Sequence, residues 1–252
     1  MRVETGNNVL IGGFIITGNA TKNVAVRGIG PSLAAFGISD ALADPTLELR
    51  TSNGGVMLQN DNWQDDSMQA SQLTAHGLAP ANSKESGFVA PLQPGAYTAI
   101  LAGKNQRIGV GVVEIFDIDG AANSQLGNIS TRGFVRTEEN VMIGGFILGG
   151  SSNNTRVALR GIGPSLAQFG LDPVLADPTL ELRDNNGVIL VSNDNWQDDP
   201  VSAAQLSAAG LPLSDPKESG IFTSLPPGQF TAILAGKNGG TGIALVEIYN
   251  VN

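Results

Sequence analysis

The sequence lacks cysteine, and it has few aromatic (5%) and charged (15%) residues, against a typical charged share of about 25%. Without thiols the chain forms no disulfide, thiolate metal site or cysteine nucleophile. It also lacks a long apolar run, since no stretch approaches the roughly 20 apolar residues that cross a bilayer, and its first residues do not have the layout of a signal peptide. We therefore expect no membrane insertion and a stability that comes from a packed core.

Basic residues are also scarce. The chain has 14 Lys and Arg against 23 Asp and Glu, for a net charge of -9, and its basic residues form no run. Binding to phosphate backbones needs clustered Lys and Arg, so we expect no nucleic acid partner. The single histidine, His76, is replaced by Ala209 in the second half of the chain, which disfavours a Ser-His-Asp mechanism.

The most informative feature present is an internal duplication. "RGIGPSLAAFG" at residue 27 returns as "RGIGPSLAQFG" at residue 160, a spacing of 133 residues, and about 53 of the 93 aligned positions that follow are identical. "IGGF" at Ile11 and Ile143 continues the repeat upstream with a spacing of 132. Self-similarity of this kind indicates repeated structural bodies, and each copy is long enough for its own core.

Two domains follow from the duplication, over residues 1–119 and 134–252, joined by a linker at residues 120–133. The second part of the linker alternates like a strand and has no equivalent before the first copy. It is either a connector or a strand that can add to an exposed sheet edge. The residues expected to carry such a strand addition are Gln125, Leu126, Ile129, Phe134 and Val135.

The local patterns predict an all-β fold. Short apolar runs rich in Val, Ile, Thr and Phe alternate with turn signals from 33 Gly and 13 Pro, which is typical of antiparallel sandwiches. We therefore expect two tandem antiparallel β-sandwich domains, jelly-roll or Ig-like, each with one or two short helices. One helix in each copy follows an aspartate cap, Asp66 or Asp199, and ends at a glycine, Gly77 or Gly210.

Acidic residues gather in the repeated loop "NDNWQDD". Carboxylate and amide oxygens suit calcium, although the spacing differs from the helix-loop-helix calcium motif. The alternative is that these side chains cap helices and form turns while the tryptophan of the loop packs below. The candidate calcium ligands are Asp61, Asp65, Asp66, Asp194, Asp198 and Asp199.

Other polar patterns have structural explanations. "GIGPSL" lacks the third glycine of a nucleotide loop and contains a proline, so we interpret it as a structural turn. Glu85 and Glu218 of the repeated "KES" are either distant metal ligands or partners of the adjacent lysines. Strand carboxylates, Glu48 with Glu114 and their equivalents, leave glycoside hydrolysis open as a third alternative.

The run from Asp177 to Val251, with "DPTLELRDNNGVILVSNDNWQDD" and "LPPGQFTAILAG", resembles the bacterial pre-peptidase C-terminal domain. The upstream run from Asn128 to Leu166 resembles tandem modules of large secreted and cell-surface bacterial proteins. These resemblances imply β-sandwiches that serve as accessory binding modules or surface repeats, some of which bind calcium near the acidic loop. A departure is that the pre-peptidase domain usually accompanies a protease, and this sequence contains none.

We expect a non-enzymatic, extracellular structural or adhesive repeat protein of the cell surface. Identical faces on successive repeats offer head-to-tail contacts, which propagate into a filament or stalk unless they close into a ring. Self-association is therefore the expected interaction. The alternative function is a calcium-dependent accessory module that binds a glycan or a surface protein.

Overall fold

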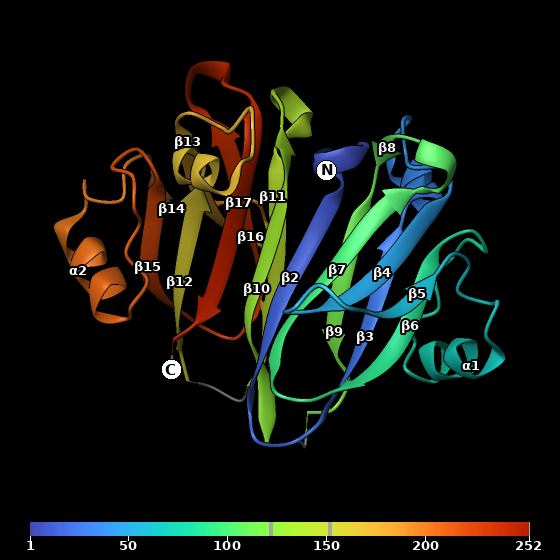
Figure 1. Cartoon of the computed structure of the whole chain (residues 1–252). Helices are drawn as coiled ribbons and strands as arrows, with labels where there is room; N and C mark the ends of the chain where they lie inside the picture. Colours follow the sequence, from blue (N-terminus) through green and yellow to red (C-terminus); the bar gives the residue numbers. More distant parts are fainter. Residues whose placement is uncertain (121–122, 151–152, 252) are drawn as a thin grey trace. The chain divides into compact units, whose positions relative to one another are not determined.

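The chain divides into two compact units, Met1–Ile129 and Ser130–Asn252, in the computed structural model, which describes residues 1–120, 123–150 and 153–251. The boundary falls inside one strand, β10 (Ser124–Val135), where we had predicted a linker over residues 120–133. Residues 121 and 122 of that predicted linker lie outside the described residues. Figure 1 shows the strands of each unit with their labels.

Unit 1 has two main sheets. One has the strand order β6-β3-β9, and the other has the order β10-β2-β7-β4-β5, while β1 pairs with β8. Its strands other than β10 are β1 (Arg2–Val3), β2 (Leu10–Gly18), β3 (Lys22–Ile29), β4 (Pro45–Thr51), β5 (Val56–Asn60), β6 (Ser86–Leu92), β7 (Gly95–Gly103), β8 (Gly109–Val110) and β9 (Val112–Asp117). Its helices are η1 (Gly6–Asn8), η2 (Pro31–Phe36), α1 (Ser67–Ala75) and η3 (Lys104–Gln106).

Unit 2 repeats this plan. Its sheets have the orders β15-β12-β17-β10 and β11-β16-β13-β14. Its strands other than β10 are β11 (Met142–Leu148), β12 (Thr155–Ile162), β13 (Pro178–Asp184), β14 (Ile189–Asn193), β15 (Ser219–Leu225), β16 (Gly228–Gly236) and β17 (Gly242–Asn250). Its helices are η4 (Glu138–Asn140), η5 (Pro164–Phe169), α2 (Pro200–Ala208) and η6 (Lys237–Gly239).

The strands form because apolar side chains alternate along them with smaller or polar ones. In β2, for example, the even-numbered residues from Leu10 to Ile16 are buried while the odd-numbered residues between them are partly exposed, as expected for a strand with one face on the core. Phe14 stacks on Tyr97 of the neighbouring β7, with ring centroids 5.5 Å apart. The same alternation recurs in β11, so each unit has its own core.

The helices begin and end where the sequence predicts. The Asp199 carboxylate accepts hydrogen bonds from the backbone N–H groups of Val201 (3.0 Å) and Ser202 (3.2 Å), and Pro200 occupies the first helical position of α2. After the helix, Gly210 has a φ of 74°, a left-handed conformation that glycine adopts without steric cost.

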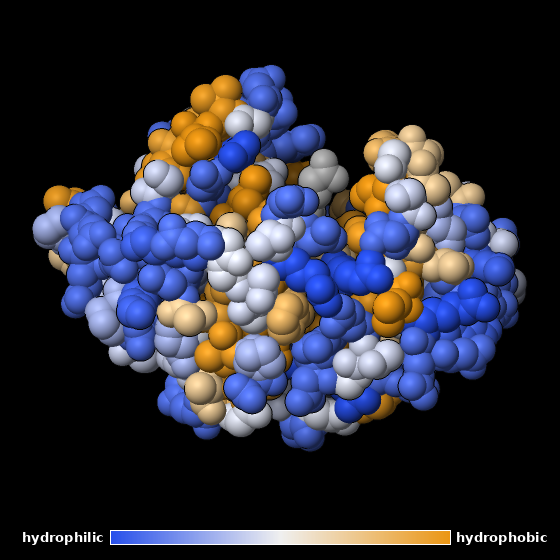
Figure 2. All heavy atoms as spheres, turned by 90° about the horizontal axis from the view of Figure 1, so that it is seen from above, coloured by the Kyte–Doolittle hydropathy of each residue, from blue (hydrophilic) through white to orange (hydrophobic). Residues whose placement is uncertain are grey.

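The predicted all-β class is confirmed, since both units consist mainly of antiparallel strands such as the pairs β2–β7 and β11–β16. None of the helices among the described residues is long and apolar enough to span a membrane. Hydrophilic side chains cover much of the face shown in Figure 2, but patches of hydrophobic residues also reach the surface. Several of the exposed apolar side chains belong to strands, among them Ile143 and Ile147 of β11.

Candidate functional site

The acidic loops lie between β5 and α1 in unit 1 and between β14 and α2 in unit 2. Asp66 accepts hydrogen bonds from the N–H groups of Met68 (2.9 Å) and Gln69 (3.2 Å), as Asp199 does at the start of α2. A carboxylate at this position satisfies amides that have no partner inside the helix. The last acid of each loop therefore has a structural role.

The first acid of each loop forms an ion pair. Asp61 pairs with Lys104, and Asp194 pairs with Lys237 at 2.5 Å. The hydrogen bond and the charge of Asp61 raise the pKa of Lys104, and Asp194 acts in the same way on the pKa of Lys237. The Oδ1 atoms of both aspartates are buried without a hydrogen-bond partner in the described structure.

The remaining acids of the loops are tied to nearby side chains. Asp65 accepts from the side-chain amide of Asn62 (3.0 Å), and Asp198 accepts from that of Asn195 (2.9 Å). Over residues 1–120, 123–150 and 153–251, no three acidic, histidine or cysteine side chains lie close enough together to hold a metal ion. Calcium binding by these six aspartates stays a prediction, and each of them already has a protein partner.

A pocket of about 610 Å³ lies beside the acidic loop of unit 2. Its floor comes from β13 and β14, and Lys237 lines it together with the acids of the loop. Polar groups and apolar carbon atoms line the pocket in similar amounts, so its lining does not select between a polar and an apolar ligand. The lining residues are Thr179, Leu180, Glu181, Ser192, Asn193, Asp194, Asp198, Asp199 and Lys237.

Glu85 and Glu218 pair with neither adjacent lysine, and each is fully buried. Oε1 of Glu218 accepts from the N–H of Gly163 (3.2 Å) and from the N–H and hydroxyl of Ser165 (3.1 and 2.5 Å), and Oε2 accepts from the N–H of Asp215 (3.3 Å). Glu85 makes the same set of bonds in unit 1. The carboxylate therefore holds the "GIGPSL" turn, which sequence reasoning had identified only as a turn.

The strand carboxylates considered for hydrolysis each pair with an arginine. Glu48 on β4 bonds Arg50 (2.6 Å), while Glu114 on β9, a strand of the other sheet, bonds Arg27 (2.5 Å). The hydrogen bond from Arg50 lowers the pKa of Glu48. In unit 2, burial raises the pKa of Glu247, the equivalent of Glu114.

The first part of β10 is built into unit 1. Its backbone lies beside the end of β2, where Asn19 donates its N–H to the carbonyl of Asn123 (3.1 Å) and the Thr17 hydroxyl donates to the carbonyl of Gln125 (3.5 Å). Leu126 and Ile129 pack against the core of this unit, while Gln125 is exposed. These contacts make the segment a strand of the sandwich.

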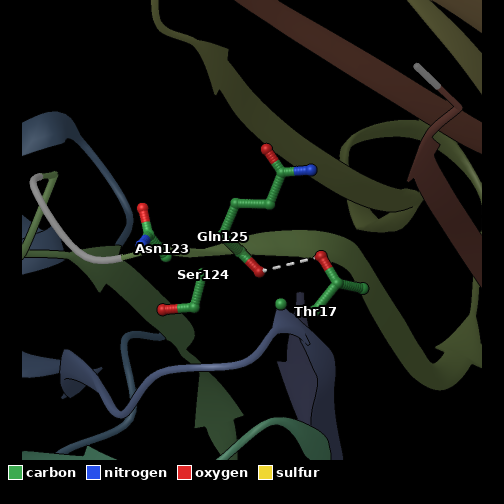
Figure 3. Close-up of a pocket in the computed structure, with 5 residues that line it drawn as sticks. Thr17, Asn123, Ser124 and Gln125 are labelled. Carbon is green, nitrogen blue, oxygen red and sulfur yellow. Dashed lines mark hydrogen bonds between the residues drawn. The ribbon is translucent and has the colours of Figure 1, made fainter.

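A second pocket, of about 350 Å³, lies where β10 meets the end of β2. Figure 3 shows Thr17 and Asn123 beside it, with the side chains of Ser124 and Gln125 pointing to opposite sides of the strand. Backbone and small polar groups line this pocket, and the described residues around it include no charged side chain. We assign it no ligand.

The second part of β10 belongs to unit 2, where β10 borders β17. Val135 is fully buried, and Phe134 packs against the hydrophobic cluster that contains Trp196 and Leu206. Arg136 lies over the Phe134 ring, 5.3 Å from its centroid. Four of the five residues predicted to carry strand addition, Leu126, Ile129, Phe134 and Val135, thus pack inside one unit or the other, while Gln125 is exposed.

Comparisons with known proteins identify no family. No protein-family model and no curated protein matches the chain. Solved structures similar to the chain include the STIV MCP (TM-score 0.26, 11% identity, covering 99% of this chain and 93% of that one) and the major capsid protein P2 from bacteriophage PM2 (0.24, 8%, 99% and 98%). The PBCV-1 virus capsid gives a TM-score of 0.21 at 8% identity, over 99% of this chain and 91% of that one.

Proposed function

We propose that the chain is a non-catalytic structural and adhesive repeat module of an extracellular, cell-surface protein. In this proposal its sandwich units are joined by structural strands and associate head to tail with further units. The observation that carries the proposal is that the connecting segment is a core strand rather than a loose tether. Leu126 and Ile129 pack in one unit, and Phe134 and Val135 pack in the other.

The chemistry of the rest of the chain supports a role without catalysis. The carboxylates that could act in hydrolysis pair with arginines, and the acids of the repeated loops cap helices or pair with lysines. Groups committed to such pairs are poorly placed to exchange protons with a substrate. Duplication of nearly every one of these contacts is typical of repeats that serve by presenting equivalent surfaces.

Assembly can be tested by imaging. We expect negative-stain images of the purified chain at rising concentration to show elongated particles or filaments, because equivalent faces on repeats make propagating contacts. A Leu126→Ser/Ile129→Ser variant removes apolar contacts of the connecting strand and is expected to reduce assembly. The matched control is Gln125→Ser, which changes an exposed residue of the same strand. A compact, monodisperse monomer at high concentration would contradict the proposal.

A second candidate function is calcium-dependent binding of a glycan or a surface protein. The pocket beside Asp194 and the unpartnered Oδ1 of that residue favour it. A bound calcium ion would have to compete with the Lys237 ammonium for the same carboxylate. Calorimetric titration with calcium should then give heat that disappears in Asp194→Ala combined with Asp61→Ala. Absence of calcium binding to the unmodified protein would exclude this candidate.

A further inference from the structure

Strand β11 is an edge strand of its sheet, whereas its equivalent in unit 1, β2, has a neighbouring strand on both sides. In unit 2 the sheet order is β11-β16-β13-β14, so among the described residues no strand lies on the outer side of β11. In unit 1 the equivalent strand β2 pairs with β7 on one side and borders β10 on the other. The duplication therefore identifies one edge that a strand covers in one copy and leaves open in the other.

The exposure of side chains follows this difference. The side chains of Ile143 and Ile147 in β11 are 51% and 69% exposed. Their equivalents in β2, Ile11 and Ile15, are less exposed and belong to the half-buried class. Monomeric proteins usually protect such edges with lysine, proline or a bulge. The sequence of β11, "MIGGFIL", contains neither a charged residue nor a proline, and its register with β16 is unbroken.

The backbone of β11 is also positioned for pairing. In unit 1 Lys104 donates its N–H to Asp44, so the even-numbered residues of β7 direct their backbone groups to β4 and the odd-numbered ones direct theirs to β2. In the register of β2 with β7, Leu10, Phe14 and Ile16 lie opposite these odd-numbered residues and bond β7. By this alternation Ile11 and Ile15 present their backbone groups to β10. Ile143 and Ile147, their equivalents, therefore direct theirs to the open edge.

We infer that the outer edge of β11 is an acceptor site for a linker strand of the β10 type, supplied by another repeat of the same kind. Main-chain hydrogen bonds would supply affinity, and apolar side chains equivalent to Leu126 and Ile129 would supply specificity, as in other cases of strand addition. The occupant is identified by the duplication, since β10 covers the matching edge in unit 1. This inference rests on the proposed function and names the contact through which repeats join.

The direct test extends the full chain by repeating residues 120–135 after Asn252. We expect the amides of Ile143, Gly145 and Ile147 to exchange with solvent at least about tenfold more slowly than in the unmodified chain, because each would gain a strand partner. The control extension carries proline at the positions of Gly127 and Ile129, where it cannot donate to a ladder. Protection that fails to appear, or that appears equally with the proline control, would overturn the inference.

A second test uses separate molecules. A fluorescent peptide with the sequence of residues 124–135 is expected to bind the unmodified protein saturably and to lose at least about tenfold in affinity for Ile147→Lys, since a charge protects an edge. Ile189→Lys, at an exposed position on β14, is the matched control and should bind normally. Equal binding to both variants would place the peptide elsewhere and overturn the inference.

The two hypotheses fail in different ways. If the purified chain assembles while β11 gains no protection from the added strand, the acceptor site is wrong and the proposed function stands. If the added strand protects β11 but no assembly forms at any concentration, the acceptor site stands and the proposed function is wrong.

Discussion

The buried carboxylate of Glu218 accepts hydrogen bonds from the amides on both sides of Pro164 and from the Ser165 hydroxyl. Proline has no N–H of its own, so this single side chain satisfies the donors of the turn. We expect Glu218→Gln to lower the free energy of unfolding by about 2–4 kcal/mol, because an amide leaves buried donors unsatisfied. Urea denaturation measures the change.

The control for this variant is Lys217→Ala, which alters an exposed neighbour. We expect it to change stability by no more than about 0.5 kcal/mol. If Glu218→Gln has the same small effect as Lys217→Ala, then the carboxylate does not hold the turn.

Tyr249 is a second residue whose environment has a measurable consequence. Burial, and then the nearby charge of Glu247, raise the pKa of Tyr249 from 10.0 to about 12. A group with a raised pKa in the folded state contributes stability that is present below pH 10 and lost as the pH rises towards 12. We expect spectrophotometric titration to show a phenolate step near pH 12.

Tyr249→Phe should remove that step from the titration curve. It should also weaken the loss of stability between pH 10 and 12, since phenylalanine does not ionise. A phenolate step from Tyr249 close to pH 10 would contradict the buried environment described here.

At the scale of elements, the two α-helices depend on their aspartate caps. We expect Asp199→Ala to cost about 1 kcal/mol of stability, because two backbone amides of α2 lose their acceptor. Thermal unfolding measures the loss. Asp198→Ala is the matched control from the same loop, since Asp198 is exposed and accepts only from the Asn195 side chain among the bonds described. Equal effects of the two substitutions would argue against the cap.

Sequence patterns predicted these elements with different success. Strand alternation and the Asp–Pro start of α2 depend on residues close together in the chain, so the all-β class and the helix were accessible from sequence. The bonds of Glu218 join residues 55 positions apart, and no local pattern encodes them. The repeated "KES" gave a signal that this glutamate matters, but not that it is buried.

The partners of the acidic loops, like those of Glu218, could not be predicted from local sequence patterns. Sequence reasoning weighed calcium ligands against caps and turns, and the structure gives each aspartate a partner within the protein. The pairing of Asp61 with Lys104 could not be foreseen, because "AGKN" lies far from "NDNWQDD" in sequence. The buried, unpartnered Oδ1 atoms have no explanation in the contacts of the described residues.

At the scale of the whole molecule, comparison of the two copies shows which sheet edges have a neighbouring strand and, among the described residues, which do not. Sequence reasoning left open whether the segment before "VRTEEN" is a connector or a strand. The structure adds that this segment is a strand, β10, with side chains packed in both units. Which edges it covers could not be predicted, since strand order depends on contacts between distant segments.

The proposed function rests on the role of β10 as a core strand, and hydrogen exchange of the β10 backbone amides tests that role most directly. We predict that amides of residues 124–135 exchange as slowly as those of the central strands β7 and β16, through global unfolding of a unit. Exchange within seconds, at the rate of an unstructured peptide, while β7 and β16 stay protected, would contradict the account.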